Sequence, residues 1–291
     1  MNKDLIGTGV ALVTPFKQDG SVDKKGVENL VSHAKKNGVE YLVLMGTTAE
    51  SVTLSKDEKK EVIDIIKEKN NGDLPLVLGI GGNNTKEVIH EIQNTNLDDY
   101  TAVLSVSPAY NRPNQEGIYQ HFKAILENTD KDIILYNVPS RTGANVAGET
   151  TLKLAHEFSN LVAIKEASPN FLQSTEIIKD KPTDFMVLSG DDEFALPMVL
   201  AGGSGVISVI GQALPTYSEM IRLGLDRKVD EAYKLHYKNL EITRSIYLEG
   251  NPTGIKALLE LQGVCNRQTR LPLVAATQGL VDILENLNNA L

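Results

Sequence analysis

The sequence predicts an α/β fold, a (β/α)8 barrel followed by a C-terminal helical extension. Short apolar runs alternate with amphipathic segments along most of the chain, and such alternation favours parallel strands joined by helical crossovers. Eight apolar runs are present, which is the number of strands that closes a barrel of this kind. The last part of the chain, after residue 211, contains only helical patterns.

The candidate strands have the short, branched, apolar composition of strands that are covered on both faces. They are residues 9–16, 41–46, 75–82, 100–108, 132–139, 161–167, 186–191 and 205–211. A doubly wound open sheet is the competing arrangement. The first strand–helix turn, however, lacks the glycine fingerprint of dinucleotide-binding folds, and the regular strand spacing favours the barrel.

The segments between the strands carry helix signals. Val27, Leu30, Val31 and Ala34 follow helical spacing, and the residues 55–58 (Ser-Lys-Asp-Glu) form a capping-box pattern. After the eighth strand, we expect helices at 217–225, 229–247, 254–261 and 275–287. We therefore assign residues 1–225 to the barrel and residues 226–291 to an extension packed on it, because no flexible linker separates them.

Composition excludes several functional classes. The net charge is −9 and the sequence pI is about 5.2, and no basic block suggests a nucleic-acid partner. No apolar run reaches the length of about 20 residues that spans a bilayer, and the N-terminus lacks a signal-peptide pattern. The single cysteine, Cys265, favours a reducing compartment, so we expect a cytoplasmic protein.

Metal-binding patterns are also lacking. The five histidines are scattered on helical segments, without metal-ligand spacing, and we interpret each as a satisfied surface histidine. The acidic stretch at residues 190–193 (Gly-Asp-Asp-Glu) is interpreted as a helix N-terminus, where carboxylates oppose the macrodipole. We therefore expect no metal cofactor.

The candidate for chemistry is Lys165, which lies near the end of the sixth strand. Burying a lysine is costly, and desolvation lowers a lysine pKa. A neutral lysine amine can attack a carbonyl to form a Schiff base. Because side chains alternate along a strand, Leu161, Ala163 and Lys165 should share the inner face, with Val162, Ile164 and Glu166 outside. A lysine solvated at the strand's mouth is the alternative interpretation.

Other strand ends carry polar residues suited to the same chemistry. Tyr136 on the fifth strand could shuttle protons beside Lys165, with the hydroxyls of Thr47 and Thr48 after the second strand. Arg141 has the planar fork that binds a carboxylate. Each has a structural alternative: a core tyrosine, a turn threonine or a surface arginine. Their joint position on one rim favours function.

Three sequence pieces resemble the dihydrodipicolinate synthase family. They are residues 46–51 (Gly-Thr-Thr-Ala-Glu-Ser), 136–143 (Tyr-Asn-Val-Pro-Ser-Arg-Thr-Gly) and 163–167 (Ala-Ile-Lys-Glu-Ala). The second piece is the most discriminating, because the other two are shared with N-acetylneuraminate lyase and keto-sugar-acid aldolases. The resemblance covers essentially the whole chain.

The resemblance implies a lyase that condenses pyruvate with L-aspartate 4-semialdehyde in lysine and diaminopimelate biosynthesis, without an added cofactor. It implies a homotetramer or homodimer. The site residues that it implies are the Schiff-base lysine Lys165, the acid/base Tyr136, the relay members Thr47 and Tyr110, the pyruvate-holding Thr48 and Ile207 backbone, and the carboxylate anchor Arg141. Tyr110 would reach into a neighbouring subunit's site.

The chain departs from the family pattern at a few positions. Ala49 replaces the usual glycine of the Thr-Thr-Gly-Glu motif, which matters only if that position needs a positive φ. Lys56 and Lys59 stand where lysine-inhibited members often carry histidine, and Ala109 replaces a tyrosine of the same region. Cationic side chains should repel a cationic effector, so we expect weak or absent lysine inhibition.

Two alternatives remain open. One is a sugar-acid aldolase or lyase of the same fold, which usually lacks an arginine at the position of Arg141. The other is a non-catalytic barrel that binds a keto acid as a sensor. Arg141→Ala tests the aldolase alternative, because a large rise in the Michaelis constant for the semialdehyde would favour the synthase. The sensor would form no covalent adduct with pyruvate.

Overall fold

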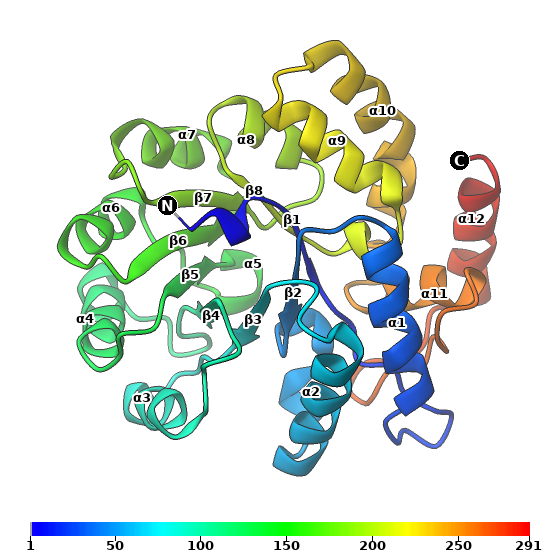
Figure 1. The fold of residues 1–291 in the computed structure, drawn as a ribbon, viewed down its shortest axis with the longest axis horizontal. Helices are drawn as coiled ribbons and strands as arrows, with labels where there is room; N and C mark the ends of the chain where they lie inside the picture. Colours follow the sequence, from blue (N-terminus) through cyan, green and yellow to red (C-terminus); the bar gives the residue numbers. More distant parts are fainter. Residues whose placement is uncertain (1) are drawn as a thin grey trace.

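The eight predicted strands form a closed barrel. The computed structural model describes residues 2–291. Within them the parallel strands pair in sequence order, and β1 pairs with β8 to close the sheet (Figure 1). The (β/α)8 prediction is therefore confirmed. The strands are β1 (Gly7–Ala11), β2 (Tyr41–Leu44), β3 (Leu76–Gly79), β4 (Ala102–Val106), β5 (Ile133–Asn137), β6 (Leu161–Glu166), β7 (Met186–Ser189) and β8 (Gly205–Ser208).

Helices surround the barrel as an outer ring (Figure 1). They are α1 (Lys24–Lys36), α2 (Lys56–Asn70), α3 (Thr85–Asn94), α4 (Gln115–Leu126), α5 (Pro139–Thr142), α6 (Gly148–Glu157), α7 (Phe171–Asp180), α8 (Ala195–Leu200) and α9 (Pro215–Leu225). Short 3-10 turns are η1 (Lys3–Leu5), η2 (Thr47–Ala49), η3 (Ser51–Thr53) and η4 (Ile210–Gln212).

Three further helices follow the barrel. They are α10 (Val229–Ser245), α11 (Thr253–Leu261) and α12 (Gln278–Asn289). α10 packs against α9, and α12 packs against both α10 and α11. In Figure 1 these helices lie together on the side of the ring formed by α9 and α1. No helix within residues 2–291 is both long enough and apolar enough to cross a membrane.

Apolar side chains fill both the space between strands and helices and the barrel lumen. The lumen cluster includes Val43, Leu104, Ile134 and Leu188 along its walls, and Leu5 from η1 is fully buried in it. Tyr41 also lies in the lumen, opposite its strand partner Gly9. A Cβ on Gly9 would lie 2.0 Å from the Tyr41 ring, so only glycine accommodates that ring. The lumen is thus a packed core.

The alternation predicted for the sixth strand is partly wrong. Ile133 pairs with Leu161, but Ile134 pairs with Ala163, so Val162 is an extra residue in β6. Because of this register shift, the two residues that precede Ala163 point to the faces opposite to those predicted, as happens at a β-bulge. Leu161 packs in the cluster outside the barrel, and Val162 packs against the lumen cluster. After the shift, the predicted inner positions of Ala163 and Lys165 hold.

Two helix signals had different outcomes. The capping box of α2 is confirmed, since Ser55 Oγ accepts from the Glu58 N–H and Glu58 Oε2 accepts from the Ser55 N–H. The acidic stretch before α8 was interpreted wrongly for Asp192, because α8 begins only at Ala195. Asp192 is 3% exposed and accepts hydrogen bonds from Ser208 Oγ at 2.6 Å and the Ile210 N–H at 3.1 Å.

The prediction of surface histidines is wrong for His121. Its side chain is 5% exposed, and Nδ1 lies 2.9 Å from Thr85 Oγ1. Burial lowers the pKa of His121 to about 4, since removing the ring from water disfavours its charged form. The helical spacing that placed His121 on α4 could not indicate which face of the helix would be covered.

Candidate active site

Lys165 and Tyr136 face each other near the carboxyl ends of β6 and β5. The two residues are register partners, and Lys165 Nζ lies 4.3 Å from the centroid of the Tyr136 ring. Their side chains are 5% and 7% exposed. The structure thus brings the predicted amine and phenol together on the inner face of the barrel, at the end where functional groups of such barrels collect.

A buried hydrogen-bond network lies directly behind this pair. Asn137 and Glu166 are the next register partners, and both are fully buried on the opposite face. Asn137 Nδ2 donates to Glu166 Oε1 at 2.9 Å, and Gln173 Nε2 donates to Glu166 Oε2 at the same distance. Because each buried polar group has partners, this network holds β5 and β6 in the register that pairs Tyr136 with Lys165.

Gly190, at the end of β7, was missed by the sequence reasoning. A Cβ at this position would lie 2.7 Å from Ala167 Cβ and 3.0 Å from Lys165 Cε. The absence of a side chain therefore leaves the space that the Lys165 side chain occupies. The only sequence signal was a glycine after an apolar run, which is indistinguishable from an ordinary turn glycine.

Thr47 and Thr48 lie in η2, the turn that follows β2. Thr47 is exposed, whereas Thr48 is 3% exposed. Thr48 Oγ1 accepts a hydrogen bond from Asn251 Nδ2 at 2.9 Å. The positive φ of this turn, 53°, belongs to Glu50, and Ala49 does not have one. Alanine in place of the family's glycine is therefore accommodated without backbone strain.

Arg141 lies on α5, after β5, and its side chain is exposed. Arg141 Nη2 donates to the backbone carbonyl of Asn251 at 3.3 Å. Asn251 thus contacts both Thr48 and Arg141, although it lies in the segment between α10 and α11. Sequence reasoning missed Asn251, because a single asparagine far along the chain carries no local sign of these contacts.

Tyr110 is not brought into contact with the other candidates. Its side chain is 92% exposed, and its backbone has a φ of 65°. The loop around it is tethered to the segment after β5. The Tyr110 N–H donates to the Thr142 carbonyl at 3.2 Å, and Arg112 Nε donates to the Gly143 carbonyl at 2.6 Å. The loop is held beside the site while the tyrosine ring lies in solvent.

Ile207 lies on β8 with its side chain in the lumen cluster. The chain immediately after it is fixed by Asp192, which also accepts a hydrogen bond from the Tyr247 hydroxyl at 2.7 Å. Burial, with the Asp192 carboxylate nearby, raises the pKa of Tyr247 well above its usual range. The hydroxyl therefore stays protonated and donates. Asp192 and Tyr247 were not found from the sequence.

The arrangement suits carbonyl chemistry at an amine. A buried lysine beside a phenol can form an imine and move the protons that this requires. Within residues 2–291, no group of three or more His, Cys, Asp and Glu side chains could hold a metal ion.

Comparisons with known proteins agree with this chemistry. The sequence profile of the Dihydrodipicolinate synthetase family matches residues 4–289. The 4-hydroxy-tetrahydrodipicolinate synthase of Flavobacterium psychrophilum is 55% identical over 281 residues, covering 96% of each chain.

Solved structures of the same family have nearly the same fold. A monomeric variant of dihydrodipicolinate synthase matches with a TM-score of 0.95 and 37% identity, covering 99% of this chain and 97% of its own. The enzyme from Cyanidioschyzon merolae, solved with lysine bound, matches with a TM-score of 0.93 and 36% identity, covering 99% of this chain and 98% of its own. The chain described here belongs to the dihydrodipicolinate synthetase family.

Proposed function

We propose that this chain condenses pyruvate with L-aspartate 4-semialdehyde to give 4-hydroxy-tetrahydrodipicolinate through a Schiff base on Lys165. The reaction is that of a lyase in lysine and diaminopimelate biosynthesis. The observation that carries the proposal is the buried pair of Lys165 and Tyr136, with Nζ 4.3 Å from the ring centroid. Since the protein supplies the covalent catalyst, the reaction needs no added cofactor.

The first half of the reaction activates pyruvate. The Lys165 amine attacks the keto carbon, and the resulting carbinolamine loses water to give the imine. Tyr136 supplies the proton that leaves with the hydroxyl group as water. The imine then loses a proton from its methyl group and becomes an enamine. Thr47, whose side chain is exposed, extends this proton path, and the Tyr110 hydroxyl of a neighbouring subunit completes it.

The second half joins the two substrates. The enamine carbon attacks the aldehyde carbon of the semialdehyde, whose carboxylate is bound by Arg141 through paired hydrogen bonds. The substrate's own amine then attacks the imine carbon and displaces Lys165, which closes the ring and frees the enzyme. Thr48 and the backbone of Ile207 hold the pyruvate carboxylate during both halves.

Assembly into a dimer or tetramer is part of the proposal. Tyr110 is 92% exposed in the single chain, which leaves its ring open to contact by a partner. A neighbouring subunit that covers this ring would bring its hydroxyl to a second active site. We place the enzyme in the cytoplasm, where its only cysteine, the buried Cys265, stays reduced.

A coupled assay with both substrates tests the function. The wild-type protein should consume both substrates, and Lys165→Ala should lose activity to the detection limit. Lys181→Ala is the matched control, because Lys181 is a partly buried lysine at the end of α7 whose Nζ donates to the Phe185 carbonyl. Substantial activity in Lys165→Ala would contradict the proposal. Cleavage of a sugar acid without condensation would instead favour the aldolase alternative.

A further inference from the structure

A second buried lysine lies outside the proposed reaction path. Lys256, on α11, is fully buried, and its Nζ lies 2.5 Å from Oε1 of Glu50, whose side chain is also buried. The same Nζ donates to the Gln268 carbonyl at 2.8 Å and lies 4.2 Å from the centroid of the Phe16 ring. A buried ion pair is costly to desolvate and needs such additional partners. Such a pair is weak evidence of added stability, so its position relative to the active site is the more informative feature.

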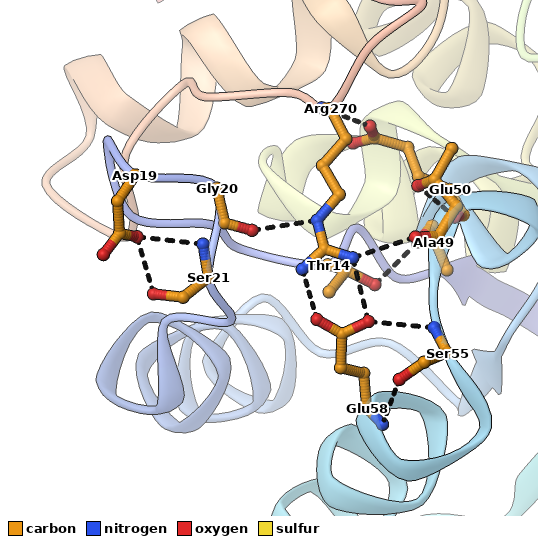
Figure 2. Close-up of polar contacts among 10 residues, drawn as sticks. Thr14, Asp19, Gly20, Ser21, Ala49, Glu50, Ser55, Glu58 and Arg270 are labelled. Carbon is orange, nitrogen blue, oxygen red and sulfur yellow. Dashed lines mark hydrogen bonds and ion pairs between the residues drawn. The ribbon is translucent and has the colours of Figure 1, made fainter.

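The other carboxylate oxygen of Glu50 is also bound. Glu50 Oε2 accepts from the backbone N–H of Arg270 at 2.9 Å. Figure 2 shows Arg270 lying between Gly20, Glu50 and Glu58. Its guanidinium donates to the Gly20 carbonyl at 2.8 Å, the Thr53 carbonyl at 2.9 Å and Glu58 Oε2 at 2.9 Å. These contacts fix the backbone at Arg270, so Glu50 is held from two separate parts of the chain's C-terminal region.

The position of Glu50 links this cluster to the active site. Glu50 directly follows η2, and its φ of 53° is in the left-handed region, which is unfavourable for a residue with a Cβ. Such a conformation persists where the surroundings determine it from several sides. The ion pair with Lys256 and the Arg270 N–H supply these constraints at the point where the chain leaves the turn that carries Thr47 and Thr48.

The rest of the turn is anchored as well. Thr14 Oγ1 donates to the Ala49 carbonyl at 2.7 Å (Figure 2), and Asn251 Nδ2 donates to Thr48 Oγ1. A hydroxyl that accepts a hydrogen bond keeps its own proton free to donate, so Thr48 can donate to a carboxylate. Among residues 2–291, no side-chain hydrogen bond engages Thr47. The anchoring thus leaves free the hydroxyl that the proton path requires.

We propose that Glu50 is a positioning residue for pyruvate binding, and that Lys256 and Arg270 of the C-terminal extension hold it in place. The inference rests on the proposed function, because it concerns the turn that holds the pyruvate carboxylate. The extension is then part of the binding apparatus: it fixes the turn before pyruvate arrives. Displacement of the turn weakens the hydrogen bond from Thr48 and raises the Michaelis constant for pyruvate.

The test separates positioning from folding with two variants. Lys256→Met leaves the Glu50 carboxylate buried without its cation, and should lower both stability and pyruvate binding. The double variant Glu50→Gln/Lys256→Met removes both charges, and should recover much of the lost thermal stability. Its Michaelis constant for pyruvate should nevertheless stay raised by about 10- to 100-fold, the range expected when a binding group is displaced by a fraction of an ångström to an ångström.

Arg267→Ala is the control, because Arg267 lies in the same segment but pairs with Glu260, at 3.4 Å, and not with the turn. It should keep the wild-type Michaelis constant. A double variant that melts near the wild-type temperature and binds pyruvate with the wild-type constant would overturn the positioning role alone. Wild-type protein that forms no borohydride-stable adduct with pyruvate would overturn the proposed function, and this inference with it.

Discussion

Tyr136 and Lys165 are direct register partners on neighbouring parallel strands, and the lysine Nζ lies over the tyrosine ring at 4.3 Å from its centroid. The amine is therefore close to the phenol without being part of an ion pair with a carboxylate in residues 2–291. Lys256 is the opposite case, since its Nζ is bound to Glu50. This difference favours Lys165 over Lys256 as the proposed nucleophile.

Tyr136→Phe should separate the ring from the hydroxyl. The phenylalanine ring keeps the packing beside Lys165, so folding and pyruvate binding should change little. The loss of the proton donor should lower kcat by roughly 100-fold or more, the contribution usual for general acid–base catalysis. Steady-state kinetics together with the rate of adduct formation measure this. A kcat within a few fold of wild type would exclude Tyr136 from proton transfer.

Gly190→Ala should displace the lysine without removing it. The new Cβ would lie 3.0 Å from Lys165 Cε and 2.7 Å from Ala167 Cβ, so one of these groups must move. We expect imine formation to slow by about 10-fold or more, because small misplacements of reacting groups are costly. Gly279→Ala is the control, since its nearest neighbour would be Thr277 Oγ1 at 3.9 Å. Equal rates in wild type and Gly190→Ala would show that the space is not required.

Arg141→Ala should affect only the second substrate. Loss of charge-assisted hydrogen bonds to a carboxylate should cost about 1.5–3 kcal/mol of binding, which is a rise of roughly 10- to 100-fold in the Michaelis constant for the semialdehyde. Formation of the pyruvate adduct should be unchanged. Arg141→Lys should restore little, because lysine lacks the planar fork. A rise in the Michaelis constant for pyruvate alone would show that Arg141 binds pyruvate and not the semialdehyde.

His121 should make stability depend on pH. Its pKa is lowered by burial from 6.5 to about 4, so between these values the unfolded chain binds a proton that the folded chain does not. Stability should therefore fall as the pH drops from 6.5 to about 4, and the loss from this group should level off below that. His121→Asn should flatten this part of the profile in denaturant titrations. An unchanged slope would contradict the assignment.

Feedback by lysine should be weak or absent. Asn83 and Glu87 still match the positions of the family's lysine pocket, but the Asn83 side chain is bonded to the backbone of Ala109. Nδ2 donates to the carbonyl at 2.8 Å, and Oδ1 accepts from the N–H at 2.7 Å. Lys56 and Lys59 add positive charge that repels a cation. Initial rates should be unaffected by millimolar L-lysine, and an inhibition constant in the micromolar range would refute this prediction.

Local patterns predicted the barrel because each β/α unit carries its own signal. Strand periodicity also placed Tyr136 and Lys165 on one face, and strand order made them neighbours. The extra residue at Val162 could not be predicted, because a register shift depends on the pairing of two strands and leaves no local mark. Alternation from Leu161 therefore gave the wrong face for the start of β6.

Contacts between distant parts of the chain could not be predicted from the sequence. Lys256 and Glu50 are 206 residues apart, and Asn251 and Thr48 are 203 residues apart. Each of these residues has an ordinary surface interpretation when considered alone. Only the docking of α11 and its flanking segments against the end of β2 shows that they meet.

Treatment with pyruvate and borohydride, followed by mass analysis of peptides, tests the central claim most directly. The account predicts one stable pyruvate adduct per chain, on the peptide that contains Lys165, and none on the peptide that contains Lys256. An unmodified protein, or an adduct on any lysine other than Lys165, would contradict it.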